Sequence, residues 1–152
     1  MRAKSGFTLV EILIVVVILG ILAAIVIPQF TDASTEAKTS SLCSDLQTVR
    51  SQIELYKIQH NDALPIPESG GGSWNVMTMY TDIDGNTNAT KTDVFKYGPY
   101  LQKVPTNPFN DDDTIEVDGA TVGDDGGGWN YNSTTGDFRA DDSTDSAKHA
   151  QL

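Results

Sequence analysis

Hydrophobic residues follow two different patterns along the first 60 residues. From Phe7 to Ile27 the chain is apolar, and Glu11 is its one charged residue. As a helix this stretch would measure about 30 Å, enough to cross the hydrocarbon core of a bilayer. Beyond Gln29 the apolar residues recur at steps of four and three, which is one face of an amphipathic helix. These residues are Leu42, Leu46, Val49, Ile53 and Tyr56. We predict a long helix made of an apolar part (7–28) and an amphipathic part (29–60).

The rest of the chain, residues 61–152, has the pattern of a small globular domain. Prolines and glycines over 64–72 cannot continue the helix, and Asp84-Gly85 predicts a tight turn flanked by residues 79–80 and 94–95. Strands are predicted at 114–117, 128–132 and 136–140, the last two forming a hairpin. Trp129, Tyr131 and Phe138 alternate along this hairpin, so they should face the amphipathic helix. The fold class is therefore α+β, a long helix packed on a small antiparallel sheet, with a mobile polar tail at 141–152.

Charge and composition exclude several classes of function. The 152 residues carry a formal net charge of −11 without a basic stripe, which argues against nucleic acid as a partner. Cys43 is the only cysteine, so no internal disulfide can form, and we expect it to be a small buried side chain. His60 and His149 lack the spacing of metal ligands, and no catalytic triad or phosphate loop can be assembled. We predict that the protein is not an enzyme and holds no resident cofactor, with calcium as the one candidate.

The calcium candidates are carboxylates in the later loops. Oxygen-rich loops can bind Ca²⁺, although blocks of like charge more commonly form a solvated surface. The residues are Asp111, Asp112, Asp113, Asp118, Asp124 and Asp125.

Glu11 and the residues before it do not fit an ordinary export signal or a plain anchor. A secretory signal has its cleavage site after the apolar run, whereas here that run is long and begins directly after Gly6. A plain anchor fits the length, and Arg2 and Lys4 would keep the N-terminus cytoplasmic. A carboxylate inside such a span costs roughly 2.5–3.5 kcal/mol, and is tolerated mainly beside a partner that neutralises it. Glu11 therefore requires a cation from elsewhere.

The residues around this acid resemble a known family. Lys4-Ser5-Gly6 followed by Phe7-Thr8-Leu9-Val10-Glu11 is similar to the class III signal of type IV pilins and pseudopilins. The resemblance implies that prepilin peptidase cuts between Gly6 and Phe7 and methylates the new amino group, and that Glu11 serves the enzyme and filament assembly. Gly20 and Pro28 fall where the family has its helix-weakening residues.

Gly20 and Pro28 allow two interpretations. Pro28 has no N–H for the carbonyl of Ala24 and its ring crowds that carbonyl, so the helix should kink or lose hydrogen bonds there. The weakness is either an ordinary irregularity of a membrane helix or a segment from Gly20 to Pro28 that unwinds when subunits enter a filament.

A second segment points to one branch of the family. Residues 104–109, Val-Pro-Thr-Asn-Pro-Phe, are similar to the segment before the sheet in major pseudopilins of type II secretion. The resemblance also implies a late-loop calcium ion, but residues 124–128 do not reproduce the ligand pattern of that family.

The function that the resemblance implies is structural. We expect an inner-membrane protein with one span and a periplasmic C-terminal domain, which becomes a helical homopolymer after cleavage of residues 1–6. Its partners would be further copies of itself, prepilin peptidase, the inner-membrane assembly platform, minor pilins and, before assembly, the membrane. The alternatives are the major pilin of a surface pilus or a membrane-tethered acidic binding module, which would keep its leader.

Overall fold

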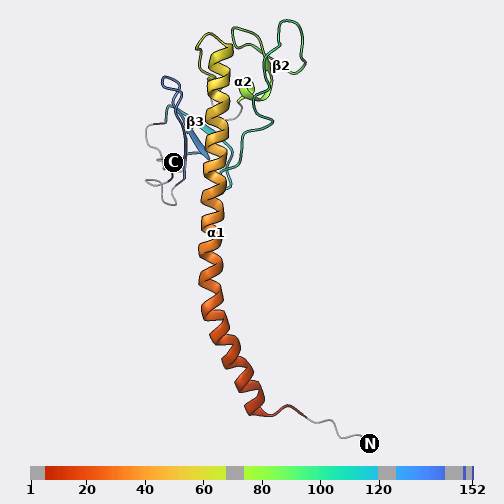
Figure 1. The fold of residues 1–152 in the computed structure, drawn as a ribbon, viewed down its shortest axis with the longest axis vertical. Coiled ribbons are helices and arrows are strands. Elements are labelled where there is room, and N and C mark those ends of the chain that lie inside the picture. Colours follow the sequence, from red (N-terminus) through yellow and green to blue (C-terminus); the bar gives the residue numbers. More distant parts are fainter. Residues whose placement is uncertain (1–5, 68–73, 120–125, 143–148, 150–151) are drawn as a thin grey trace, which may run out of the picture. The chain divides into compact units, whose positions relative to one another are not determined.

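The computed structural model describes residues 6–67, 74–119, 126–142, 149 and 152. The chain divides into two compact units, residues 1–37 and residues 38–152, and each is described by itself. Helix α1 (Leu9–Gln59) contributes to both units (Figure 1).

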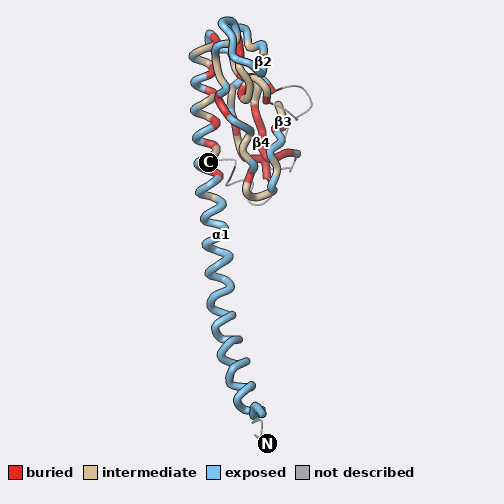
Figure 2. The backbone as a smooth tube through the Cα atoms, turned by 90° about the vertical axis from the view of Figure 1, so that its right-hand side faces the viewer, coloured by how far each residue is buried: buried red, intermediate tan, exposed pale blue. Residues whose placement is uncertain are grey.

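In the first unit the described chain is helical from Leu9 onward and exposed on all sides. Each residue from Gly6 to Ala37 is exposed, including the whole apolar run (Figure 2). This part of α1 is long and apolar enough to cross a membrane, by length and composition. α1 continues without interruption through Gly20 and Pro28, although Pro28 cannot donate the helical hydrogen bond to Ala24. Close behind the proline, the Thr31 hydroxyl donates to the Pro28 carbonyl at 2.8 Å.

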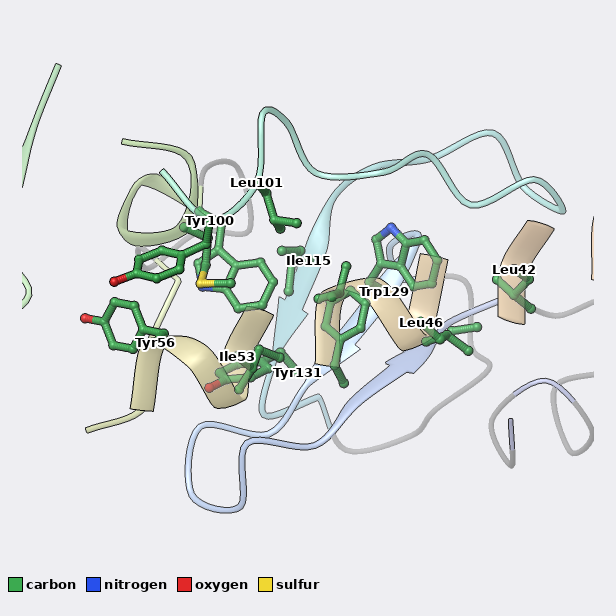
Figure 3. Packing of buried hydrophobic residues seen from close by; sticks show 14 residues of the cluster. Leu42, Leu46, Ile53, Tyr56, Tyr100, Leu101, Ile115, Trp129 and Tyr131 are labelled. Carbon is green, nitrogen blue, oxygen red and sulfur yellow. The ribbon is translucent and has the colours of Figure 1, made fainter. Parts of the chain in front are cut away.

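In the second unit, one face of α1 forms the centre of the core, as the spacing predicted. Leu42, Leu46, Val49, Ile53 and Tyr56 are at most 3% exposed. Trp129, Tyr131 and Phe138 are completely buried in the same cluster, which confirms that the alternating aromatic residues face the helix (Figure 3). The Phe138 ring stacks on both Trp129 and Trp74, with centroids 5.0 and 5.6 Å apart.

The main sheet has the order β3-β4-β5, from β3 (Ile115–Val117), β4 (Trp129–Tyr131) and β5 (Phe138–Ala140). β4 and β5 are antiparallel, pairing Tyr131 with Phe138, so the predicted hairpin is confirmed. β3 is parallel to β4, which differs from the predicted antiparallel sheet. A tight turn would force the antiparallel direction, whereas residues 118–128 separate β3 from β4 along the chain, which is too long for such a turn.

A second, two-stranded sheet follows the short helix α2 (Asn75–Thr78). It pairs β1 (Tyr80–Thr81) with β2 (Thr87–Asn88) in antiparallel direction. Gly85 has a φ of 85° and donates to the Asp82 carbonyl at 3.2 Å, which confirms the predicted turn. The returning strand is β2 rather than residues 94–95, which lie outside the strands.

One expectation about burial needs correction, and one segment is only partly described. Cys43 is exposed rather than buried, because it follows Leu42 by one residue and is rotated about 100° from the buried face of α1. Most of the segment 141–152, which we predict to be mobile, lies outside the described residues, but Asp141, Asp142 and His149 are buried. The His149 Nδ1 and the Asp142 Oδ1 are 2.9 Å apart, and the imidazole packs on the Phe109 ring. Composition alone could not predict that these polar residues are buried. A buried polar group is stable where it finds a hydrogen-bond partner, and composition does not show which partner it will meet.

Candidate functional site

The start of α1 is organised by reciprocal hydrogen bonds between Thr8 and Glu11. The Thr8 hydroxyl accepts from the Glu11 N–H at 3.3 Å, and the Glu11 carboxylate accepts from the Thr8 N–H at 3.4 Å. The Thr8 carbonyl also accepts from the Ile12 N–H, as expected of an N-cap residue. Together these bonds form a capping box, in which two N–H groups without helical partners are satisfied.

The capping box was missed in the sequence analysis, which treated Glu11 only as a charge. The signal was present, because Thr8 and Glu11 have the Thr-x-x-Glu spacing that precedes an apolar helix. Glu11 therefore has a local role at the helix start in addition to its charge.

The proposed cleavage position lies directly before this box. Gly6, Phe7 and Thr8 are outside the helix, and Phe7 is 76% exposed. Arg2 and Lys4, the basic residues of the leader, fall outside the described residues. After Glu11 the next basic residue along the chain is Lys38, so the apolar run itself offers no cation.

Gly20 and Pro28 lie on the exposed apolar part of α1. A Cβ added at Gly20 would have no neighbouring atom within 4 Å, so the packing of this chain does not require a glycine there. Two explanations for a glycine at this position remain: close packing against another helix, and a weakening of α1 itself.

Two of the acidic residues considered for calcium, Asp112 and Asp118, accept hydrogen bonds from other residues of the domain. The Asp112 Oδ1 accepts from the Thr114 N–H at 2.8 Å. The Asp118 carboxylate accepts from the Ser133 hydroxyl and N–H at 2.6 and 2.8 Å, and these bonds lower its pKa. Within the described part of the chain, no three His, Cys, Asp or Glu side chains gather into a metal site. Asp124 and Asp125 lie outside the described residues, and Asp111 and Asp113 belong to no such group.

The proline-containing segment 104–109 packs against the sheet. The Trp129 indole donates to the Pro105 carbonyl at 2.7 Å, and the buried Asn107 amide donates to the Gly128 carbonyl at 2.8 Å. The Asn107 Oδ1 in turn accepts from the Phe109 N–H at 3.0 Å. The segment therefore satisfies buried polar groups at the start of β4, a structural role in the domain.

Comparisons with known proteins agree with the residues at the N-terminus. The family model described as the prokaryotic N-terminal methylation motif matches residues 1–27. The type II secretion system core protein G of Pseudomonas aeruginosa is 36% identical over 108 residues, which cover 71% of this chain and 70% of the relative. The protein of the same name from Vibrio cholerae is 29% identical, with 83% and 84% covered.

A relative from a pilus is similar as well. The type IV narrow pilus major component of Thermus thermophilus is 35% identical over 98 residues, which cover 59% of this chain and 84% of the relative. No solved structure matches the chain with significance.

Proposed function

Since this chain belongs to the family of type II secretion system core protein G, and is therefore a structural subunit of a type IV pilin-like filament, we propose that Phe7 and Glu11 drive its polymerisation. Prepilin peptidase would cut between Gly6 and Phe7 and methylate the new amino group. The ammonium of Phe7 in one copy would then meet the Glu11 carboxylate of a neighbouring copy.

The observation that carries the proposal is one acid at the start of an apolar helix whose residues are all exposed. Each residue of α1 from Leu9 to Ile27 is exposed, and Glu11 has no cation among them. Exposed apolar surface of this size must be covered by lipid or by other helices. A neighbouring copy can offer both an apolar helix and, after cleavage, an ammonium group. Two charges that are costly in hydrocarbon would then neutralise each other as the helices pack.

Gly20 and Pro28 would have a separate role in this proposal. Proline in a helix interior costs about 3 kcal/mol and glycine about 1 kcal/mol relative to alanine. The stretch 20–28 is therefore the part of α1 that would unwind most easily as the helix moves from lipid into the filament. The continuous helix of the single chain would be the state before assembly.

The surroundings of the subunit follow from the same apolar helix. Arg2 and Lys4 would hold the leader in the cytoplasm, and the domain would lie in the periplasm. The partners would be prepilin peptidase, the inner-membrane assembly platform, minor pilins and further copies of this chain.

The test replaces Glu11 in the full chain, expressed with its processing and assembly machinery. In Glu11→Gln and Glu11→Leu the ammonium of the neighbour stays unneutralised, and the cost of about 2.5–3.5 kcal/mol corresponds to a roughly hundredfold loss of polymer. Sheared filaments would be quantified, and the mass of the subunit would show whether it begins at methylated Phe7. A density map of the filament would show whether residues 20–28 remain helical.

Glu36→Gln is the matched control, because it makes the same chemical change at an exposed position of the same unit. It should assemble like the native chain. Normal filaments from the Glu11 variants would contradict the proposal, and an intact leader in the native protein would support the membrane-tethered binding module.

A surface pilus is the second candidate for the assembled filament. The relative from Thermus thermophilus, a pilus component by its name, favours it. The similarity to core protein G covers more of this chain, so we place the filament in type II secretion. Imaging would separate the two, since a pilus extends from the cell surface and a secretion filament stays in the periplasm.

A further inference from the structure

We propose that the face of the sheet β3-β4-β5 opposite α1 carries a binding site for the side-chain carboxamide of a partner protein, an asparagine or a glutamine, with Asn130 at its centre. The site lies in the second unit and makes no use of the apolar helix. It is therefore independent of the function proposed for Phe7 and Glu11, and it adds a contact between the domain and another protein chain.

Asn130 is the buried polar residue of the central strand β4. Its neighbours Trp129 and Tyr131 belong to the core, so by strand alternation the Asn130 side chain points to the other face of the sheet. There it stands in register between Glu116 of β3 and Arg139 of β5. Asn130 is only 6% exposed, yet within the described part of the chain its Nδ2 has no hydrogen-bond acceptor. A buried donor without an acceptor is unfavourable, so the oxygen atom of a ligand would complement it.

Next to this amide the surface has a small polar cavity of about 120 Å³, lined by Gly119, Asn130, Asn132, Asp137 and Arg139. Sites for whole small molecules measure about 300–1,000 Å³, whereas one water takes about 30 Å³ of the liquid. The cavity therefore has room for one functional group, such as the end of a side chain. A Cβ added at Gly119 would lie 2.7 Å from the Asn130 Nδ2, so the glycine leaves the approach to this amide open.

The groups around the cavity complement a carboxamide better than a carboxylate. Asn130 offers N–H donors for the oxygen of a ligand, and so does Arg139, because a guanidinium has several N–H groups and its Nη2 donates to Asp137. The Asp137 carboxylate is exposed beside them and can accept from the N–H of a ligand. It would repel a second carboxylate in the same place. A carboxamide has both an oxygen and an NH₂ group on one carbon, so it can satisfy the donors and the acceptor together.

The test uses the full chain in detergent micelles, with nitrogen-15 in its asparagine and arginine side chains. Magnetic resonance follows the Asn130 Nδ2 and Arg139 Nε signals during titration. The probe is propionamide, which has the end group of asparagine and glutamine. Propionate has the same shape with a charge, and N-methylacetamide represents a peptide group. We expect both signals to shift and saturate with propionamide, with a Kd in the millimolar range for so small a ligand. The other two probes should bind roughly threefold more weakly, since each loses a hydrogen bond.

Two substitutions locate the site. Asn130→Leu is close in shape and removes the amide, so propionamide should bind about tenfold more weakly, read at the Arg139 Nε signal. Arg139→Lys keeps the charge and replaces the planar donor, so binding read at the Asn130 signal should weaken several-fold. The matched control is Asn88→Leu, the same change in strand β2 at a residue that does not line the cavity, and it should bind like the native chain. Near-UV circular dichroism shows that each variant has kept its core.

The site would be refuted if propionamide gave no saturable shift in the native chain, because the cavity would then hold solvent alone. Equal affinity in the native chain and in Asn130→Leu would remove Asn130 from it. Tighter binding of propionate would indicate an anion site, and tighter binding of N-methylacetamide a site for peptide backbone, and either result contradicts the assignment to a side-chain carboxamide. None of these measurements depends on filament formation, so the function proposed for Glu11 succeeds or fails separately.

Discussion

At the scale of single residues, Asp82 shows how one carboxylate orders a turn. Its Oδ1 accepts from the N–H groups of Asp84 and Asn86 at 3.0 and 2.9 Å, and its Oδ2 accepts from the Asn86 side chain at 2.8 Å. The bond from the Asn86 side chain is the main cause that lowers the pKa of Asp82, and the backbone bonds add to it. An aspartate shortly before a glycine predicts a turn from the sequence alone. The number of hydrogen bonds that the carboxylate accepts is known only from the structure.

The lowered pKa of Asp82 predicts a loss of stability in acid. A carboxyl whose folded pKa is depressed stabilises the fold above its unfolded pKa of about 3.9, and this contribution disappears as the pH falls through the folded pKa. Asp82→Asn should therefore lower the Tm at pH 7, and the difference from the native chain should shrink below about pH 4. Thermal unfolding of the full chain in detergent at pH 7 and pH 3 measures this. Asp93→Asn, at an exposed position, is the control; an equal difference at both pH values for Asp82→Asn would contradict the assignment.

At the scale of elements, α1 has two kinds of surface along one continuous helix. Its first part is exposed on every side, while its second part buries only the face from Leu42 to Tyr56 (Figure 2). The spacing predicted that face correctly, because apolar residues at steps of three and four share one side of a helix. The same spacing explains why Cys43 is exposed, because Cys43 lies one residue beyond Leu42 and therefore off the buried face. The general tendency of cysteine to be buried had suggested the opposite.

Leu46 and Cys43 should consequently respond in opposite ways to truncation. Leu46→Ala leaves a cavity in the core and should lower the free energy of unfolding by about 2–5 kcal/mol. Cys43→Ala should change it by less than about 0.5 kcal/mol, as for surface substitutions. Tryptophan fluorescence can follow unfolding in detergent, because Trp74 and Trp129 are in the core. The native Cys43 should also react with a maleimide before unfolding, and slow labelling would show that it is covered.

At the scale of the whole molecule, the hydrophobic core lies in the second of the two units. Among the described residues, the buried hydrophobic residues of the core all come from Leu42 onward, and none belongs to the first unit. The second unit therefore has its own core, while the described residues of the first unit are exposed.

A fragment of residues 31–152 should thus fold without the apolar run. We expect cooperative thermal unfolding and a monomer in solution, because the fragment keeps the core and lacks the apolar surface of residues 9–27. Near-UV circular dichroism and sedimentation measure the two properties, with the full chain in detergent as the reference. A fragment without a cooperative transition would show that the core depends on the first unit.

The sequence by itself determined the features that depend on local spacing or on a contiguous motif. These are the apolar helix with its acid, the motif around Gly6 and Phe7, the buried face of α1 and the hairpin of β4 and β5. Each follows from helix or strand periodicity, or from residues adjacent in the chain.

Only the tertiary structure decided how distant segments meet. It placed β3 parallel to β4, joined Asn107 to the start of β4, and buried His149 beside Asp142 in a segment that reads as a polar tail. The physical reason is that a polar residue is stable inside a protein when a partner completes its hydrogen bonds, and the partner lies far away in the chain.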